Sequence, residues 1–229
     1  MRILVACEES QRVCKEFRKL GHEAFSCDIL PCSGGHPEWH IQDDVLKHLD
    51  DGWDLLIAHP PCTYLSRGGC RWLFPKGILN KGRYVKGLEA KDFFLKFINA
   101  NIPMIAVENP YPHKIFDMPK ESQTIQPYQF GHKHQKATLL WLKNLPLLQP
   151  TKMVKPEYYI CSKGWRHSKF TANWNAKEKS KTFIGIAKAM AEQWHKPEVN
   201  GCSPLDDKKE GGNGIPPTNK LVGILPKIL

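Results

Sequence analysis

The chain has 229 residues, 41% of them hydrophobic and 24% charged, so it is long enough to bury a core without disulfide or metal staples. No apolar run approaches the roughly 20 residues of a membrane span, and the first residues lack the layout of a signal peptide. We therefore expect a cytoplasmic protein with no membrane partner. Its eight cysteines are expected to be reduced thiols and not a secreted disulfide framework.

The net charge of +10 is unevenly distributed. Residues 1–60 carry 6 basic and 11 acidic side chains, whereas residues 61–196 carry 23 basic and 8 acidic ones. One interpretation is that the basic part faces a polyanion such as nucleic acid. The other is a solvated basic surface that keeps the protein soluble, and charge alone does not separate the two.

The first 110 residues alternate between strand-like and helical patterns. Short apolar runs predict buried strands over residues 2–7, 22–30, 53–59 and 103–109. Helical spacing of apolar residues predicts helices over 10–21, with Ser10 at the N-cap, and over 87–101. This rhythm favours an α/β fold with a Rossmann-like, mostly parallel sheet and helices on both faces. Ligands bind such sheets at the carboxyl ends of the strands.

The second half of the chain has a different pattern. Residues 124–131 and 137–145 predict two strands that form a hairpin or extend the sheet edge, and 182–194 predict an amphipathic helix. Residues 146–181 show no clear period and are expected to form a long basic and aromatic loop region. We predict one domain over 1–196 and a disordered tail over 197–229, where apolar residues are scarce.

Residues able to carry chemistry follow the four predicted strands. Cys7 and Glu8 follow the first, Asp28 the second, Cys62 the third and Glu108 the fourth. Cys62 lies in "AHPPCTYLS" (58–66), where two prolines stiffen the loop. A cysteine of this kind is either a small buried hydrophobic residue or a nucleophile held over the sheet edge.

Two motifs together resemble those of one enzyme family. "PPCTYLS" (60–66) is similar to the Pro-Pro-Cys loop of the DNA (cytosine-5) methyltransferases, and "VENP" (107–110) is similar to their Glu-Asn strand end. The "HPPCTYL", "QPYQFG" and "IAKAMAEQW" stretches resemble the short phage and prophage members, and the resemblance covers about residues 1–195. It implies an S-adenosylmethionine-dependent methyltransferase fold with a mixed, mostly parallel sheet, acting in the cytoplasm of a bacterial host cell.

The resemblance also assigns catalytic roles. Cys62 would attack C6 of cytosine, and Glu108, protonated because burial raises its pKa, would donate to N3. C5 would then accept a methyl group from S-adenosyl-L-methionine, and the target base would be flipped out or already single-stranded. In "HQKAT" (134–138), Lys136 alone keeps the positive charge of the family's supporting Gln-x-Arg-x-Arg strand.

The cofactor site follows from the same resemblance, with Asp28 at the ribose hydroxyls and Asp44 at the adenine amino group. The first loop, "ACEESQR" (6–12), lacks the family's glycines. It is either an ordinary turn capped by Ser10 or a cofactor loop. In the second case the next helix offers N–H groups to the cofactor carboxylate, and Glu8 or Glu9 pairs with the amino or sulfonium charge. The predicted cofactor residues are Cys7, Glu8, Ser10, Asp28, Ile29, Asp44, Val45, Pro60 and Thr182.

The family's target-recognition domain is replaced here by the short region 146–181. This favours DNA methylation with little sequence specificity, through phosphate contact and stacking, on duplex or single-stranded DNA. C5 methylation of a free cytidine nucleotide stays open as the alternative. No obligate protein partner is inferred. "SRGGCRW" (66–72) is either a mobile lid or an exposed turn. The predicted nucleic-acid-binding residues are Ser66, Arg67, Lys163, Arg166 and Lys169.

The sequence leaves other functions open. Cys27, Cys32, His36 and His40 are close together, but their spacing is not typical of a structural zinc site, so no metal is predicted. "HPPC" is related to the Asn/Asp-Pro-Pro-Tyr loops of amino-group methyltransferases, which need an aromatic residue where Cys62 stands. A non-catalytic nucleic-acid-binding protein with a methyltransferase fold is the third hypothesis, and the altered first loop is its best support.

Overall fold

The computed structural model of the chain describes residues 1–160, 164, 166–168 and 176–195. They belong to one compact unit, Met1–Pro197. The predicted tail, 197–229, lies outside the described residues. The strands are β1 (Arg2–Ala6), β2 (Glu23–Cys27), β3 (His40–Ile41), β4 (Leu55–Ala58), β5 (Met104–Asn109), β6 (Gln123–Ile125), β7 (Thr138–Lys143), β8 (Tyr158–Ile160) and β9 (Arg166–Ser168). The α-helices are α1 (Arg12–Lys19), α2 (Cys70–Leu73), α3 (Lys81–Ile98), α4 (Ala176–Ser180) and α5 (Ile184–Trp194).

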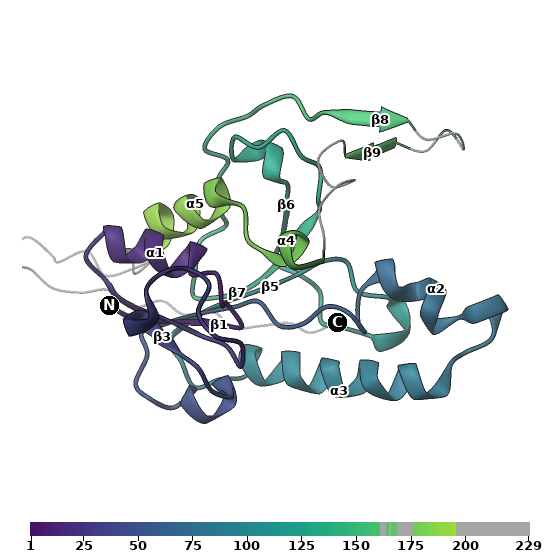
Figure 1. The fold of residues 1–229 in the computed structure, drawn as a ribbon, viewed down its shortest axis with the longest axis horizontal. Helices are drawn as coiled ribbons and strands as arrows, with labels where there is room; N and C mark the ends of the chain where they lie inside the picture. Colours follow the sequence, from purple (N-terminus) through teal and green to yellow (C-terminus); the bar gives the residue numbers. More distant parts are fainter. Residues whose placement is uncertain (161–163, 165, 169–175, 196–229) are drawn as a thin grey trace, which may run out of the picture. The chain divides into compact units, whose positions relative to one another are not determined.

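Seven strands form one mixed sheet in the order β3-β2-β1-β4-β5-β7-β6 (Figure 1). The first five in this order pair in parallel, and β7 runs antiparallel to both β5 and β6. This confirms the predicted α/β class with a mostly parallel sheet that is compatible with a Rossmann-like fold. Because the five parallel strands end at one edge, the loops after β1, β2, β4 and β5 meet there.

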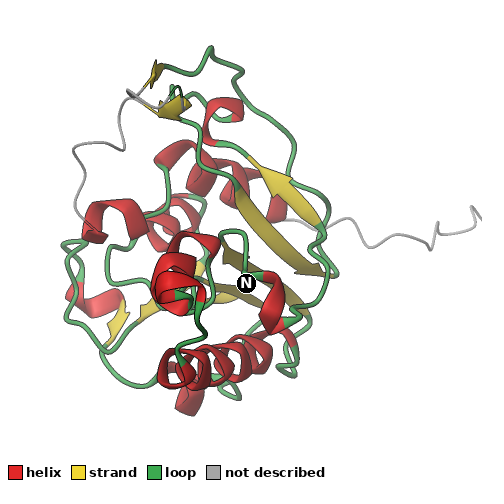
Figure 2. Ribbon diagram, turned by 90° about the vertical axis from the view of Figure 1, so that its right-hand side faces the viewer, coloured by secondary structure: helices red, strands yellow, loops and turns green. Residues whose placement is uncertain are grey.

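Helices cover both faces of the sheet, as predicted (Figures 1 and 2). Ile3 and Val5 of β1 pack in one core cluster with α1 and α5, whereas Leu4 and Ala6 pack in a second cluster with α3. Successive side chains of a strand point to opposite faces. The continuous apolar runs in the sequence therefore reflect burial of the central strands on both sides.

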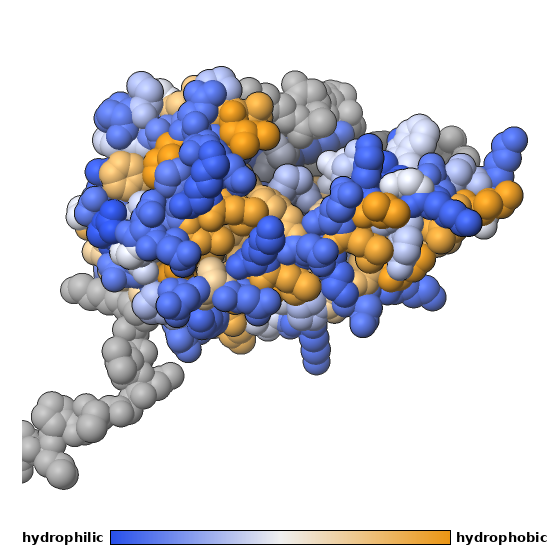
Figure 3. All heavy atoms as spheres, turned by 90° about the horizontal axis from the view of Figure 1, so that it is seen from below, coloured by the Kyte–Doolittle hydropathy of each residue, from blue (hydrophilic) through white to orange (hydrophobic). Residues whose placement is uncertain are grey.

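Two helices begin at residues other than those expected. The sequence placed Ser10 at the N-cap of the first helix, but the N-cap of α1 is Gln11, which has φ 55° and caps no N–H with its side chain. α3 begins at Lys81, six residues earlier than predicted, because the Asn80 side chain accepts a hydrogen bond from the backbone N–H of Arg83. Figure 3 shows the side of the molecule on which α3 lies, where hydrophilic side chains interleave with hydrophobic ones.

The region 146–181 contains regular structure that the sequence did not predict. β8 and β9 form a two-stranded antiparallel hairpin, and α4 follows at Ala176–Ser180. Elements of three to five residues are too short to show a period in the sequence. Residues 127–129, expected to continue a strand, instead form a 3-10 turn that begins at Pro127. None of the helices described is long and apolar enough to cross a membrane.

Candidate active site

The loop after β4 holds Cys62 in a fixed turn. The Cys62 carbonyl accepts hydrogen bonds from the backbone N–H groups of Leu65 (3.2 Å) and Ser66 (2.9 Å). Below the turn, the buried Asn109 side chain donates to the Pro60 carbonyl at 2.9 Å. Because both prolines restrict the backbone and Asn109 ties it to β5, the orientation of the loop is determined from two sides.

The loops after β4 and β5 are also joined to each other. The backbone N–H of Arg67 donates to the Tyr111 carbonyl at 2.9 Å, and that of His113 donates to the Leu65 carbonyl at 2.7 Å. The Arg67 guanidinium lies 5.3 Å from the centre of the Tyr111 ring. The segment after Cys62 is thus anchored to the segment after Glu108 by backbone bonds and by a cation–π contact.

Glu108 is paired with His59, a residue to which the sequence assigned no role. In the parallel register Ala58 lies opposite Val107, so the next residues of the two strands, His59 and Glu108, are neighbours. His59 Nδ1 lies 3.1 Å from Glu108 Oε2, and the two side chains are only 8% and 15% exposed. Within the described part of the chain, no hydrogen-bond partner lies at the buried His59 Nε2.

This pair reverses the pKa expected for Glu108. The sequence predicted a pKa raised by burial, but in the structure the Glu108 pKa is lowered: burial raises it, and the hydrogen bond and charge of His59, with a smaller effect of Lys136, outweigh burial. Burial acts to lower the His59 pKa, and Glu108 together with Glu8 outweighs it, so the His59 pKa is raised. The shared proton therefore resides on the imidazole.

Glu108 and Lys136 both act on the charge of Cys62. Burial raises the pKa of the Cys62 thiol, the charge of Glu108 raises it further, and the charge of Lys136 lowers it. Lys136 Nζ donates to the Lys179 carbonyl at 2.7 Å, which fixes the ammonium between β7 and α4. The thiol is therefore mostly protonated near neutral pH, and Lys136 is the cation that favours its thiolate.

Glu8 occupies the position expected for the cofactor carboxylate. Its Oε1 and Oε2 accept hydrogen bonds from the N–H groups of Val13 (2.8 Å) and Cys14 (3.2 Å) at the start of α1. Of the two interpretations of this loop, the one that offers these N–H groups to a ligand is not supported, because Glu8 itself caps the helix. The pairing of Glu8 or Glu9 with a cofactor charge stays a prediction. Burial raises the pKa of Glu8, and His59 opposes this shift.

Asp28 and Asp44, predicted to hold the adenosine half of the cofactor, both accept hydrogen bonds from backbone N–H groups. Burial raises the pKa of Cys7, and the charges of Asp28, Cys27 and Asp44 raise it further. Asp28 Oδ1 accepts from the N–H of Leu30 at 2.9 Å, and Asp44 Oδ1 accepts from the N–H of Leu46 at 3.0 Å. Both carboxylates are thus held in fixed orientations at the strand-end rim.

The hydrophobic residues predicted beside these carboxylates differ in exposure. The Ile29 side chain is 73% exposed, whereas Val45 is 4% exposed and packs in the core cluster of α3. The Val45 side chain therefore leaves almost no surface for a ligand. Thr182, just before α5, accepts a hydrogen bond from Arg12 Nη1 at 2.9 Å on its carbonyl, which ties the final helix to the start of α1. Ser10 lies between β1 and α1.

The predicted nucleic-acid residues are only partly described. Ser66 and Arg67 lie on the Cys62 loop and Arg166 lies in β9, but Lys163 and Lys169 fall outside the described residues. In the described chain no three His, Cys, Asp or Glu side chains gather as a metal site. Cys32 Sγ donates to the Gln11 side chain, and His40 bonds to Ser26 and to the Leu30 carbonyl, so these residues hold the loop after β2.

The fold and the residues at the carboxyl ends of its strands define the class of the chain. It is an α/β protein in which the loops after the parallel strands carry a thiol, an imidazole and several carboxyl groups. No protein-family model matches the chain, and no curated protein matches it. Sequence reasoning missed the roles of His59 and Asn109. The register of β4 and β5, which places His59 beside Glu108, is the signal that reveals the first.

Proposed function

We propose that the chain is an S-adenosylmethionine-dependent methyltransferase that transfers a methyl group to C5 of cytosine in DNA, with little sequence specificity. One observation carries the proposal: Cys62 and Glu108 follow neighbouring parallel strands, and Asn109, the residue after Glu108, is hydrogen-bonded to the loop of Cys62. The motifs that carry the resemblance to cytosine-5 methyltransferases, "PPCTYLS" and "VENP", are the two segments that Asn109 joins.

The residues present fit one half of the cofactor better than the other. Asp28 and Asp44 accept hydrogen bonds, which suits the ribose hydroxyls and the adenine amino group. Glu8 already occupies the N–H groups at the start of α1, so these groups are not open to the carboxylate of the amino-acid half. When bound, S-adenosylmethionine supplies an electrophilic methyl group on sulfur.

The first step needs a nucleophile and a proton donor. The Cys62 thiolate forms a bond to C6 of cytosine, and the electron pair of the C5–C6 double bond moves through C4 toward N3. Glu108 takes the proton that His59 holds at Nδ1 and passes it to N3, which leaves His59 neutral. The pair thus supplies one proton although the Glu108 pKa is lowered.

The second step restores the ring. Once N3 is protonated, the enamine makes C5 nucleophilic and C5 gains the methyl group. Loss of the C5 proton to a base then re-forms the C5–C6 double bond and expels Cys62 as thiolate, and N3 returns its proton to the Glu108–His59 pair. A thiolate suits both steps because it adds readily and also leaves readily.

The test is methyl transfer from isotope-labelled cofactor to cytosine-containing DNA. Cys62→Ala should abolish the transfer, and Cys32→Ala is the matched control because Cys32 is also a half-buried thiol but bonds to Gln11. Normal transfer by Cys62→Ala would contradict the mechanism. Methyl groups on N4 of cytosine or N6 of adenine would instead indicate amino-group methylation.

The position of Glu8 favours a second candidate, a non-catalytic nucleic-acid-binding protein with this fold. A carboxylate that already caps α1 removes the N–H groups that the cofactor carboxylate would use. Calorimetric titration with S-adenosylmethionine separates the two candidates: heat of binding supports the enzyme, whereas absence of binding together with retained DNA binding supports the second candidate.

A further inference from the structure

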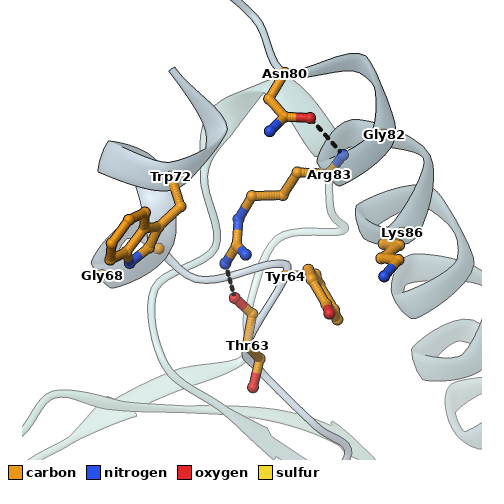
Figure 4. Close-up of a pocket in the computed structure, with 9 residues that line it drawn as sticks. Thr63, Tyr64, Gly68, Trp72, Asn80, Gly82, Arg83 and Lys86 are labelled. Atoms are coloured by element: carbon orange, nitrogen blue, oxygen red, sulfur yellow. Dashed lines mark hydrogen bonds between the residues drawn. The ribbon is translucent and has the colours of Figure 1, made fainter. Parts of the chain in front are cut away.

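A pocket of about 700 Å³ lies between the segment after Cys62 and the start of α3 (Figure 4). Its walls include two aromatic rings, Tyr64 and Trp72, and two cations, Arg83 and Lys86. Among the described residues that line it, none is acidic. Trp72 is 57% exposed, and the Arg71 guanidinium lies 4.9 Å from the centre of its ring, so part of the ring is left for a ligand.

Arg83 is held in place inside this pocket. Its Nη2 donates to the Thr63 carbonyl at 2.7 Å, and its guanidinium carbon lies 4.8 Å from the centre of the Tyr64 ring. Figure 4 shows the guanidinium between Trp72 and Tyr64. A Cβ at Gly69 would come within 2.9 Å of both Arg83 Nη2 and the Thr63 carbonyl, so glycine leaves room for the guanidinium. Arginine has five N–H donors, and those not used here remain for an anion.

The combination of rings and cations indicates the class of ligand. Exposed aromatic rings stack with nucleobases, and fixed cations pair with phosphate. Lys86 Nζ also lies 5.6 Å from the Tyr64 ring, which gives the pocket a second cation on the same wall. A base can reach such a concave site only when it is not stacked inside a duplex. The pocket is therefore suited to a nucleotide of a single strand.

Its position links it to the proposed reaction. Tyr64 is two residues from Cys62, so their Cα atoms are at most about 7.6 Å apart. We propose that the pocket binds the nucleotide next to the target cytosine in single-stranded DNA, with the base against Trp72 and the phosphate on Arg83 and Lys86, which Tyr64 holds by cation–π contacts. The assignment rests on the proposed function and specifies its substrate as the single strand.

The test is fluorescence anisotropy with a labelled single-stranded DNA of about 12 nucleotides that contains one cytosine, alongside the corresponding duplex. Trp72→Ala should weaken binding of the single strand by about 5-fold to 150-fold, the range expected for loss of one stacked base, and Trp72→Phe should retain most of the affinity. Lys86→Ala should reduce the slope of log affinity against log salt by about 0.7.

Lys96→Ala is the matched control, because Lys96 is an exposed lysine of the same helix about 15 Å further along its axis. Unchanged binding by Trp72→Ala and Lys86→Ala would overturn the proposal, and so would an equal loss in Lys96→Ala. Equal losses for the duplex would overturn the assignment to a single strand, and competition by deoxycytidine monophosphate at similar affinity would overturn the assignment to a polymer. Binding is read without methyl transfer, so failure of the Cys62 chemistry is distinguished from failure of the pocket.

Discussion

Replacing His59 with leucine should destabilise the protein because it leaves Glu108 buried without its partner. The two side chains are 8% and 15% exposed and 3.1 Å apart. Removing one partner of a buried pair costs about 3–5 kcal/mol, which for a domain of this size lowers Tm by roughly 6–20 °C. The double variant His59→Leu/Glu108→Leu should recover most of this loss, because two apolar side chains replace the pair and no carboxylate remains at position 108.

The effect should depend on pH in a defined direction. The raised His59 pKa gives stability that is present below 6.5 and lost as pH rises through the raised value. The lowered Glu108 pKa gives stability that is present above 4.5 and lost as pH falls through the lowered value. The difference in free energy of unfolding between wild type and His59→Leu should therefore be largest between pH 4.5 and 6.5, and it should become smaller at lower and at higher pH.

Urea unfolding of the wild type, both single variants and the double variant across this pH range provides the complete cycle. A His59→Leu protein as stable as the wild type at pH 5.5 would refute the reasoning. So would a double variant no more stable than the single one, since the buried charge would then not be the cause of the loss.

Three further predictions concern the thiol, its loop and the final helix. Glu108→Gln removes a charge that raises the Cys62 pKa, so iodoacetamide should alkylate the Cys62 peptide faster at pH 8, as mass spectrometry can follow; a slower reaction would contradict the coupling. Asn109→Ala leaves the Pro60 carbonyl buried without a donor and should cost about 1–3 kcal/mol in urea unfolding, and no measurable cost would argue against the anchor. Gly185→Ala places a Cβ against the Phe130 carbonyl oxygen and should cost about 1–3 kcal/mol; an unchanged Tm would show that α5 can shift freely.

The main sheet could be predicted because its strands are buried on both faces and read as continuous apolar runs. The start of α1 could not, because the cap is the Glu8 side chain, which reaches over the Gln11 turn to the N–H groups of Val13 and Cys14. A propensity rule that looks for serine immediately before the helix does not detect such a cap.

The candidate site divides in a similar way. Cys62 and Glu108 follow predicted strands and could be placed at one rim from topology alone. The protonation of Glu108 could not be predicted, because it depends on a neighbour 49 residues away that only the register of β4 and β5 specifies. The pocket lined by Trp72 could not be predicted either, because Arg83 and Lys86 lie in the first turns of α3, which begins at Lys81 and not at residue 87 as the sequence indicated.

The most direct test of the central claim is trapping of the Cys62 adduct with DNA that carries 5-fluorocytosine in place of cytosine, in the presence of S-adenosylmethionine. Fluorine at C5 cannot be removed as a proton, so the second step stops and the enzyme remains attached to the DNA. We predict a complex that survives denaturing electrophoresis, with the DNA attached to the peptide containing Cys62, from the wild type and from Cys32→Ala. Absence of the complex, or its formation by Cys62→Ala, would contradict the account.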